Sequence, residues 1–259
     1  MIIVQISDTH LIHQDQSNEI SLNRAKIFQR CIEDINRLIE TPDLVIHTGD
    51  IAQHGLKKEY HLTLDLLKAL NHPIYPTPGN KDEKLKMMAA FKKYGIKSLY
   101  ENFILYEVDE YPVRLISMDT TSETSNKGDF QKESLSALNK LLNNSPKKPT
   151  ALFMHHPPFD VSSSCKPQYE FLKLERIHDF GKVLESHRQV TNLFCGHIHR
   201  FKESFITNKK ATTVPPLATD LNMEKDPDYN TSLPMYLIHK YIDGLSLFTR
   251  HCVFLHYCC

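Results

Sequence analysis

Near the start of the chain, residues 2–10 read IIVQISDTH, an apolar run that stops at a serine and an aspartate. A short apolar run bounded by polar residues is typical of a buried strand, so we expect a strand over residues 2–6 with Asp8 just after its carboxyl end. His10 follows two residues later. This stretch therefore predicts that a buried strand brings a carboxylate and an imidazole to one end of a sheet.

The same pattern recurs along the chain. Further short strands are predicted at residues 44–47, 74–75, 103–108, 113–118 and 151–154. Between them, apolar residues at helical spacing predict helices over 27–39, 57–70 and 130–142. Alternating strands and helices are typical of an α/β fold, in which ligands bind at the carboxyl ends of the strands. We therefore expect the polar residues at those ends to converge on one crevice.

The last part of the chain follows a different pattern. After Cys195 the helical spacing fades, and short strands are predicted near 204–207, 211–214, 235–240 and 245–250. Asp243-Gly244 has the composition of a hairpin turn. The sequence contains neither an internal repeat nor a long linker, so we expect one domain that spans residues 1–259.

Charge limits the possible partners. Lys and Arg together number 31, as do Asp and Glu, and this balance argues against the basic face that binding to nucleic acid requires. A small anionic ligand stays compatible, because a bound metal could supply positive charge locally. We expect a small-molecule substrate and no nucleic-acid partner, and we leave a homo-oligomer open.

The N-terminus and the cysteines bear on location. The first apolar run lacks a basic leader and is short for a signal peptide, and no stretch approaches the roughly 20 apolar residues that span a bilayer. The six cysteines show no CxxC spacing, which favours free thiols in a reducing cytosol. We therefore expect a cytoplasmic protein without a membrane partner. The terminal pair Cys258-Cys259 could be acylated or form an intermolecular disulfide.

Five clusters of polar residues follow predicted strands. In chain order they are Asp8-x-His10, Gly49-Asp50, Gly79-Asn80, His155-His156-Pro157 and Gly196-His197-x-His199. Oxygen and imidazole ligands without thiolates suit ions such as Mn, Fe or Zn. They outnumber the three or four ligands of one tetrahedral site, and they match two ions, roughly 3.5–4 Å apart, that share a carboxylate. Together the clusters predict a dinuclear metal centre.

These clusters lie in motifs that resemble those of a known family. The motifs are ISDTHL, HTGDIAQHG, TPGNKDE, MHHPPF and CGHIHR. They are similar to those of the calcineurin-like metallophosphoesterases, and among these to the bacterial class III 3′,5′-cyclic AMP phosphodiesterases of the CpdA/Icc type. The likeness covers about residues 1–200, and the closing strands from Tyr236 onward add to it. The resemblance implies a four-layered αββα sandwich with a dinuclear centre at its strand ends.

The resemblance also implies a role for each matching residue. The first metal would be held by Asp8, His10, Asp50 and His199, and the second by Asp50, Asn80, His155 and His197. The substrate would contact His10, Asp50, Asn80, Lys81 and His199, with Asp50 and Lys81 catalytic. The family's His-x-Pro pattern favours His155 over its neighbour His156, which stays the alternative.

The activity that the resemblance implies is hydrolysis of 3′,5′-cyclic AMP, or a similar cyclic nucleotide, to 5′-AMP. A water or hydroxide bridging two divalent ions would attack phosphorus, and the ions would be Fe or Mn, with Zn as a further choice. One alternative is a phosphoesterase that acts on another phosphodiester or on a phosphomonoester. Another is a metal-binding scaffold without activity, which the complete set of ligands disfavours.

One position departs from the family's pattern. The usual Gly-Asn-His is here Gly79-Asn80-Lys81, and the histidine of relatives helps to stabilise the phosphate and to protonate the leaving oxygen. A lysine supplies positive charge, but its unperturbed pKa near 10.4 makes it a slower proton donor at neutral pH. Burial beside two cations would lower that pKa. Lys81 therefore either replaces the histidine in both roles, binds phosphate with weaker or altered catalysis, or points away from the site.

Overall fold

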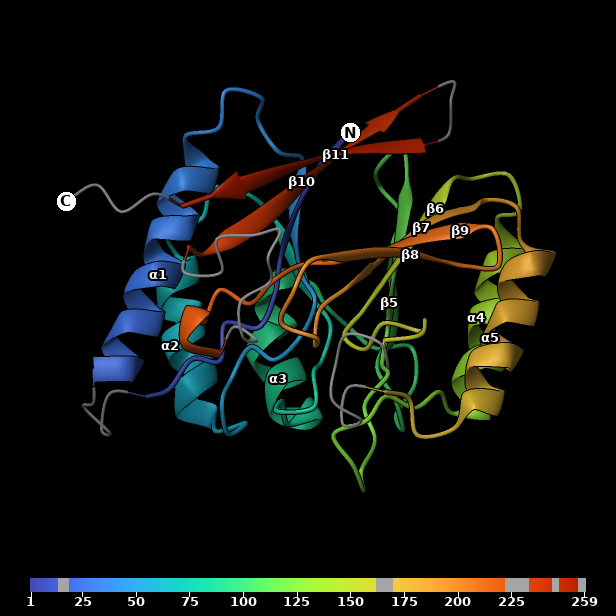
Figure 1. Cartoon of the computed structure of the whole chain (residues 1–259), viewed down its shortest axis with the longest axis horizontal. Helices are drawn as coiled ribbons and strands as arrows, with labels where there is room; N and C mark the ends of the chain where they lie inside the picture. The colour runs from blue at the N-terminus through green and yellow to red at the C-terminus, as the bar shows by residue number, and fades with distance from the viewer. Residues whose placement is uncertain (14–18, 162–169, 222–232, 244–246, 256–259) are drawn as a thin grey trace.

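Two sheets lie side by side between two groups of helices in the computed structural model of the chain (Figure 1). The structure describes residues 1–13, 19–161, 170–221, 233–243 and 247–255. The layers run from helices through two sheets to helices, which confirms the predicted α/β class and the αββα sandwich.

The first sheet has five strands in the order β11-β10-β1-β2-β3. Their bounds are β1 Ile2–Ile6, β2 Leu44–His47, β3 Ile74–Pro76, β10 Met235–Ile242 and β11 Leu247–Phe254. β1, β2 and β3 pair in parallel, whereas β10 and β11 add an antiparallel hairpin at the other edge. The carboxyl ends of the three parallel strands therefore open on the same side of the sheet.

The second sheet has six strands in the order β4-β5-β6-β7-β9-β8. Their bounds are β4 Leu105–Val108, β5 Arg114–Met118, β6 Thr150–Met154, β7 Val190–Cys195, β8 Lys202–Ile206 and β9 Lys209–Thr213. β5, β6, β7 and β9 pair in parallel, and β4 and β8 are antiparallel at the two edges. The strands β5 to β7 are almost entirely buried, as expected for a parallel sheet covered on both faces.

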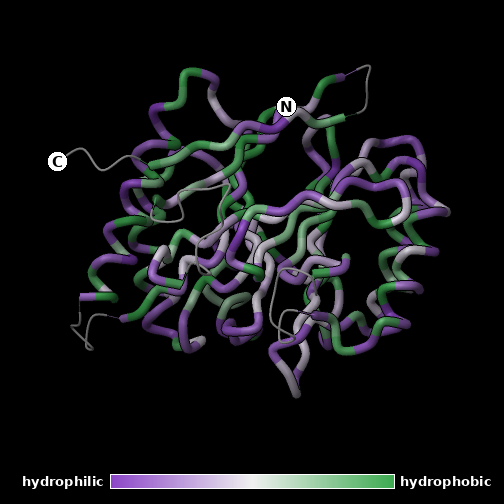
Figure 2. The backbone as a smooth tube through the Cα atoms, in the orientation of Figure 1, coloured by the Kyte–Doolittle hydropathy of each residue, from purple (hydrophilic) through white to green (hydrophobic). Residues whose placement is uncertain are grey.

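The helices cover the outer faces of the sheets. Their bounds are α1 Glu19–Asn36, α2 Lys57–Leu67, α3 Lys84–Phe91, α4 Lys132–Asn144 and α5 Leu174–Ser186. The helices α1, α2 and α3 lie against the first sheet and contribute to a hydrophobic core that also fills the space between the sheets. The helices α4 and α5 pack against the second sheet and form a second hydrophobic core with it. Figure 2 shows hydrophobic and hydrophilic residues alternating along α4 and α5, as amphipathic helices require. Each helix among the described residues is too short or too polar to cross a membrane.

Some helix predictions need correction. The helix expected over 27–39 begins earlier, at Glu19, and ends at Asn36, which leaves Ile39 fully exposed. The helix expected over 57–70 ends at Leu67. The helices α3 and α5 were not predicted, and no bounds were predicted for the strand β7, whereas α4 and the other strands were predicted within a few residues. Cys165, Cys258, Cys259 and Gly244 lie outside the described residues, and the described cysteines are free thiols.

Candidate metal centre

The polar residues that follow five different strands meet at the edge where the carboxyl ends of both sheets lie side by side. Three groups of side chains are close enough to share an ion: Asp8, His10 and His199 form the first, Asp8, Asp50 and His155 the second, and His155, His156 and His197 the third. Asp8 and His10 follow β1, Asp50 follows β2, and the histidines follow β6 and β7. The predicted convergence of these side chains therefore takes place.

The first cluster surrounds Asp8, which is completely buried. Its Oδ1 lies 3.6 Å from Nε2 of His10 and 3.3 Å from Nε2 of His199. Nε2 of His10 also lies 3.5 Å from Oδ2 of Asp50. Four donor atoms thus face a common point.

The second cluster surrounds His155. Its Nε2 lies 3.1 Å from Oδ1 of Asn80 and 3.1 Å from Nδ1 of His197. The same Nε2 lies 3.6 Å from Oδ2 of Asp50. Because Oδ2 of Asp50 is about equally far from His10 and His155, this carboxylate occupies the place that a ligand shared by two ions takes.

These donor atoms fit metal ions. Within the described part of the chain, Oδ1 of Asp8 and both ring nitrogens of His10 are buried and have no hydrogen-bond partner. Buried polar atoms normally have one, so a cation is the group that would satisfy them. Nδ1 of His155 donates to the Thr48 carbonyl at 2.7 Å, and Nδ1 of His199 donates to the Leu221 carbonyl at 2.8 Å. Each bond leaves the Nε2 lone pair of its ring for a metal.

The ionisation of the site also suits metal binding. Burial lowers the pKa of His155 and His197, which keeps both imidazoles neutral and able to bind a cation. Burial raises the pKa of Asp50 to about 6, although His10 opposes this shift. Two neighbouring cations would lower that pKa again and hold the carboxylate ionised.

The backbone is strained at the same residues. Five candidate ligands have positive φ, namely Asp8 (52°), His10 (43°), Asp50 (53°), His197 (72°) and His199 (52°). Residues with side chains rarely adopt this conformation, and it persists where surrounding structure enforces it, most often at functional sites. Here the β1 and β2 loops are bonded together, since the amides of Asp8 and His10 donate to the carbonyls of Gly49 and Asp50, both at 3.0 Å.

The two adjacent histidines have different surroundings. The Thr120 hydroxyl accepts from the backbone amide of His156 at 3.1 Å and lies 2.9 Å from Nδ1 of His156, to which it donates when Nε2 carries the ring proton. Nε2 of His156 then donates to the Asn126 carbonyl at 3.1 Å. Both nitrogens of His156 are therefore engaged, although its ring lies 4.2 Å from that of His197. The arrangement favours His155 as the ligand.

The loop after β3 holds Asn80 against Asp50. The Lys81 amide donates to Oδ1 of Asp50 at 2.7 Å. The Asp82 carboxylate accepts from the amides of Gly79 at 3.0 Å and of Ile51 and Ala52 at 3.1 Å, which joins the β2 and β3 loops. The sequence analysis assigned no role to Asp82, because two of its hydrogen-bond partners, Ile51 and Ala52, follow β2 and are distant in sequence. The Lys81 side chain is partly exposed and makes no hydrogen bond or ion pair with the residues that the structure describes.

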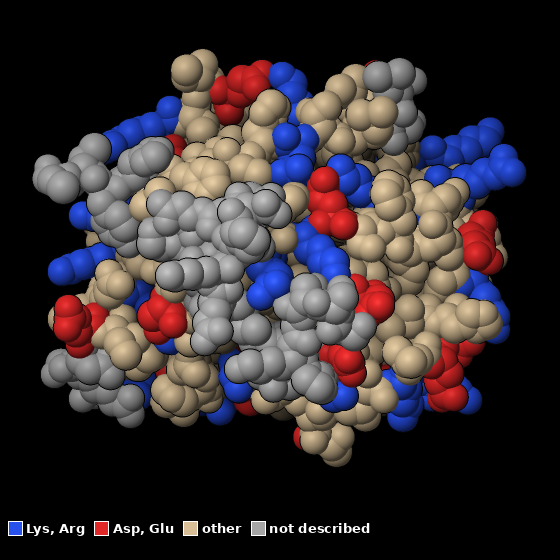
Figure 3. Space-filling view, viewed as in Figure 1, with Lys and Arg blue, Asp and Glu red and all other residues tan. Residues whose placement is uncertain are grey.

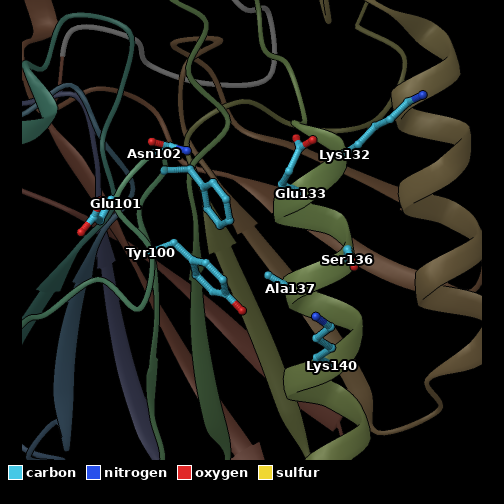
Figure 4. A pocket seen from close by; sticks show the side chains of 9 residues that line it. Tyr100, Glu101, Asn102, Lys132, Glu133, Ser136, Ala137 and Lys140 are labelled. Atoms are coloured by element: carbon cyan, nitrogen blue, oxygen red, sulfur yellow. The ribbon is translucent and has the colours of Figure 1, made fainter.

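A cavity of about 850 Å³ opens beside Asn80. Its walls come mainly from α3, from residues 98–104 and from the loop after β5, which sequence analysis did not single out. Lys84, one of the lining residues, pairs with Asp119 at 2.9 Å. The segment 100–103 also faces α4 across a second cavity of about 550 Å³ (Figure 4). The first cavity is large enough for a small organic group next to the candidate metal centre.

Comparison with known proteins agrees with this geometry. Residues 1–201 match the model of the family described as Calcineurin-like phosphoesterase. The chain belongs to this family. The predicted resemblance is thereby confirmed, and so is the prediction of an enzyme: the chain is a hydrolase of a family that uses a dinuclear metal centre.

Two relatives with different named activities are similar to this chain. The chain is 31% identical over 255 residues to the probable glycerophosphodiester phosphodiesterase GpdQ of Arcobacter nitrofigilis, with 96% of this chain and 92% of the relative covered. It is 28% identical over 198 residues to the 3′,5′-cyclic adenosine monophosphate phosphodiesterase CpdA of Escherichia coli, with 76% and 69% covered. Among solved structures, a dimetal phosphatase from Danio rerio has a TM-score of 0.69 at 14% identity, with 92% of each chain covered. This last likeness supports the fold.

Proposed function

We propose that this phosphoesterase is a dinuclear-metal phosphodiesterase that hydrolyses small diesters. Asp8, His10, Asp50 and His199 would hold one ion, and Asp50, Asn80, His155 and His197 the second. The observation that carries the proposal is the position of Asp50, whose Oδ2 lies 3.5 Å from His10 Nε2 and 3.6 Å from His155 Nε2. The absence of thiolates from the donor set favours Mn or Fe, with Zn as a further choice.

The chemistry divides between the ions and the chain. When bound, the ions supply a nucleophile at neutral pH and offset the negative charge that develops on phosphate. The buried imidazoles and carboxylates hold the reacting centre in a place with little water, which strengthens every charge interaction there. Lys81 follows the ligand Asn80 directly, and we assign its ammonium to the phosphate and to protonation of the leaving oxygen.

The substrate that we propose first is a glycerophosphodiester. The relative from Arcobacter nitrofigilis named for that activity aligns with 96% of this chain at 31% identity, whereas the relatives named as cyclic AMP phosphodiesterases align with 76–88% at 23–28% identity. The cavity beside Asn80 could take one alcohol of the diester. Its walls carry Glu83, Glu101 and Glu123, and its one lysine is paired, so a neutral or positively charged alcohol suits it better than a second phosphate.

The second candidate substrate is 3′,5′-cyclic AMP. Several relatives named as cyclic AMP phosphodiesterases match 76–88% of the chain, at 23–28% identity. The charge balance supports a small-molecule substrate, and Figure 3 shows basic and acidic side chains interspersed over the described part of the face in view. The free cysteines among the described residues support a cytoplasmic enzyme.

The test compares three substrates on protein stripped of metal and resupplied with Mn²⁺ or Fe²⁺. Glycerophosphoethanolamine, 3′,5′-cyclic AMP and bis-p-nitrophenyl phosphate would be assayed for hydrolysis, with Asp50→Ala as the inactive control. We expect metal-dependent turnover that Asp50→Ala abolishes, and the highest kcat/KM for the glycerophosphodiester. A higher kcat/KM for cyclic AMP would establish the second candidate. No turnover of any diester by the metal-loaded protein would refute a phosphodiesterase.

A further inference from the structure

A buried arginine on α1 lies beside the first cluster of candidate ligands. Arg24 is 5% exposed, and its Nε and Nη2 donate to the two carboxylate oxygens of Asp220 at 3.0 and 2.6 Å. Its Nη1 donates to the backbone carbonyl of His10 at 2.9 Å and to Oε1 of Gln53 at 2.7 Å. A planar guanidinium with a two-pronged carboxylate contact is a stiff link between the segments that it joins.

The pair of Arg24 and Asp220 connects to two candidate ligands, His10 and His199. On one side Arg24 holds the backbone of His10, which has the strained φ of 43°. On the other side Asp220 belongs to the 3-10 turn Thr219–Leu221, and the carbonyl of Leu221 accepts from Nδ1 of His199 at 2.8 Å. Arg24 and Asp220 thus connect His10 with the carbonyl that orients His199.

The two residues before Thr219, Leu217 and Ala218, lie against Ser7 and Asp8. The amide of Leu217 donates to the carbonyl of Ser7, and the amide of Ala218 donates to the carbonyl of Asp8, both at 3.1 Å. Asp8 and His199 therefore contact residues 217–221, which Arg24 reaches through Asp220, and His10 contacts Arg24 itself. His155 of the second cluster depends on a different group, the Thr48 carbonyl.

We propose that Arg24 and Asp220 are positioning residues that set the affinity of one metal position, the one formed by Asp8, His10 and His199. The inference rests on the proposed metal centre. Removal of either partner frees the His10 backbone or the turn behind His199, and the imidazole lone pairs then no longer converge. Groups that orient metal ligands in this way typically change metal affinity by about 10- to 100-fold.

The test is a calorimetric titration of the metal-free protein with Mn²⁺, which needs no substrate. Arg24→Lys keeps the positive charge and loses the two-pronged contact, and Asp220→Asn removes the carboxylate charge. We expect two binding sites in the unmodified protein. In either variant, one site keeps its affinity and the other weakens by roughly 10- to 100-fold.

Arg114→Lys is the matched control. Arg114 is 1% exposed, and its guanidinium donates to the Leu141 carbonyl at 3.1 Å, between β5 and α4. This variant should lower the midpoint of thermal unfolding and leave both Mn²⁺ affinities unchanged.

Three outcomes would overturn the inference. Wild-type affinities at both sites in Arg24→Lys and Asp220→Asn would do so, as would equal weakening of both sites. Absence of Mn²⁺ binding by the unmodified protein would contradict the metal centre itself, and the inference with it. If Arg24→Lys does not fold, Asp220→Asn carries the test, because the Asp220 side chain is 30% exposed.

Discussion

At the scale of single residues, hydrogen-bond partners distinguish two adjacent imidazoles. Both His155 and His156 are completely buried at the end of β6. Nδ1 of His155 donates to the Thr48 carbonyl, and its Nε2 faces the cluster. Both ring nitrogens of His156, in contrast, are hydrogen-bonded to Thr120 and Asn126. A metal ligand needs a free lone pair, so the two residues should respond differently to substitution.

We expect His155→Ala to lose one of two bound Mn²⁺ ions and His156→Asn to keep both. The first change removes a donor atom, while the second disturbs only a group that contacts Thr120 and Asn126. Metal content after gel filtration, measured by plasma mass spectrometry, checks the prediction. Loss of an ion from the His156 variant alone would reverse the assignment.

Substrates with different leaving groups can distinguish the two roles proposed for Lys81, which are binding of the phosphate and protonation of the leaving oxygen. A natural diester releases an alkoxide that needs a proton, whereas p-nitrophenolate leaves without one. We expect Lys81→Met to lower kcat for glycerophosphoethanolamine by about 100-fold, at the lower end of the range for general acid catalysis, and to affect bis-p-nitrophenyl phosphate much less. Lys86→Met, five residues further along in α3, is the control and should leave both rates unchanged, because its ammonium donates to the Gly55 carbonyl. Equal losses on both substrates would limit Lys81 to binding phosphate.

At the scale of elements, the sharp turns after the strands depend on glycine where two loops touch. A Cβ on Gly196, just after β7, would lie 2.1 Å from Oγ of Ser7 and 2.7 Å from Oδ2 of Asp8. No side chain fits there, so the β1 loop and the β7 loop can approach only across a glycine.

Gly196→Ala should therefore displace Asp8 and reduce bound Mn²⁺ by at least one equivalent. Gly181→Ala, in the middle of α5, is the control, since its nearest contact would be 3.5 Å away. The control should keep its metal and gain roughly 0.5–1 kcal/mol of stability, because alanine favours a helix interior over glycine. Metal content and urea unfolding measure both effects, and full metal binding by Gly196→Ala would refute the steric argument.

The two unpredicted helices show why local pattern was insufficient at this scale. α3 buries only Met87 and Phe91, so its sequence carries little helical periodicity, and its N-cap is Glu83 in place of the usual Ser, Thr, Asp or Asn. α5 contains Gly181, which lowers helix propensity. Packing against the sheets stabilises both helices, and that packing is not visible in a short window of sequence.

At the scale of the whole molecule, a chain of buried polar groups crosses from the first sheet to the second. His239 of β10 donates to Oε1 of Gln5 at 2.8 Å, and Nε2 of Gln5 donates to the Cys195 carbonyl at 2.8 Å. The same amide lies 3.4 Å from the Thr48 hydroxyl. Burial lowers the pKa of His239 to about 3, so it stays neutral in the folded protein.

This burial makes stability depend on pH. In the unfolded chain a histidine has a pKa of about 6.5, so below that pH only the unfolded state takes up the proton. The free energy of unfolding should therefore fall by about 1.4 kcal/mol per pH unit from about pH 6.5 towards pH 3 on account of His239 alone. Between pH 7 and pH 5, the free energy of unfolding of His239→Gln should fall by about 2 kcal/mol less than that of the unmodified protein.

Urea unfolding at the two pH values, with metal removed by chelator, measures this difference. His251→Gln, an exposed position on β11, should retain the full pH dependence. An unchanged pH dependence in His239→Gln would show that this histidine is not held neutral.

The sequence by itself determined the class of the fold, the family and the set of candidate ligands. Strand ends, glycines and donor atoms such as those of Asp8 and His197 are local features, and they stand in the order in which the chain visits the edge of the sheets. The helix ends and the helices α3 and α5 were harder to predict from the sequence, because they depend on packing against other elements. Only the tertiary structure decided that Asp50 lies between two clusters, that His156 is engaged elsewhere, and that Arg24 and Asp82 connect the ligand loops. Each of these depends on a partner from a distant segment, and such contacts exist only after the chain has folded.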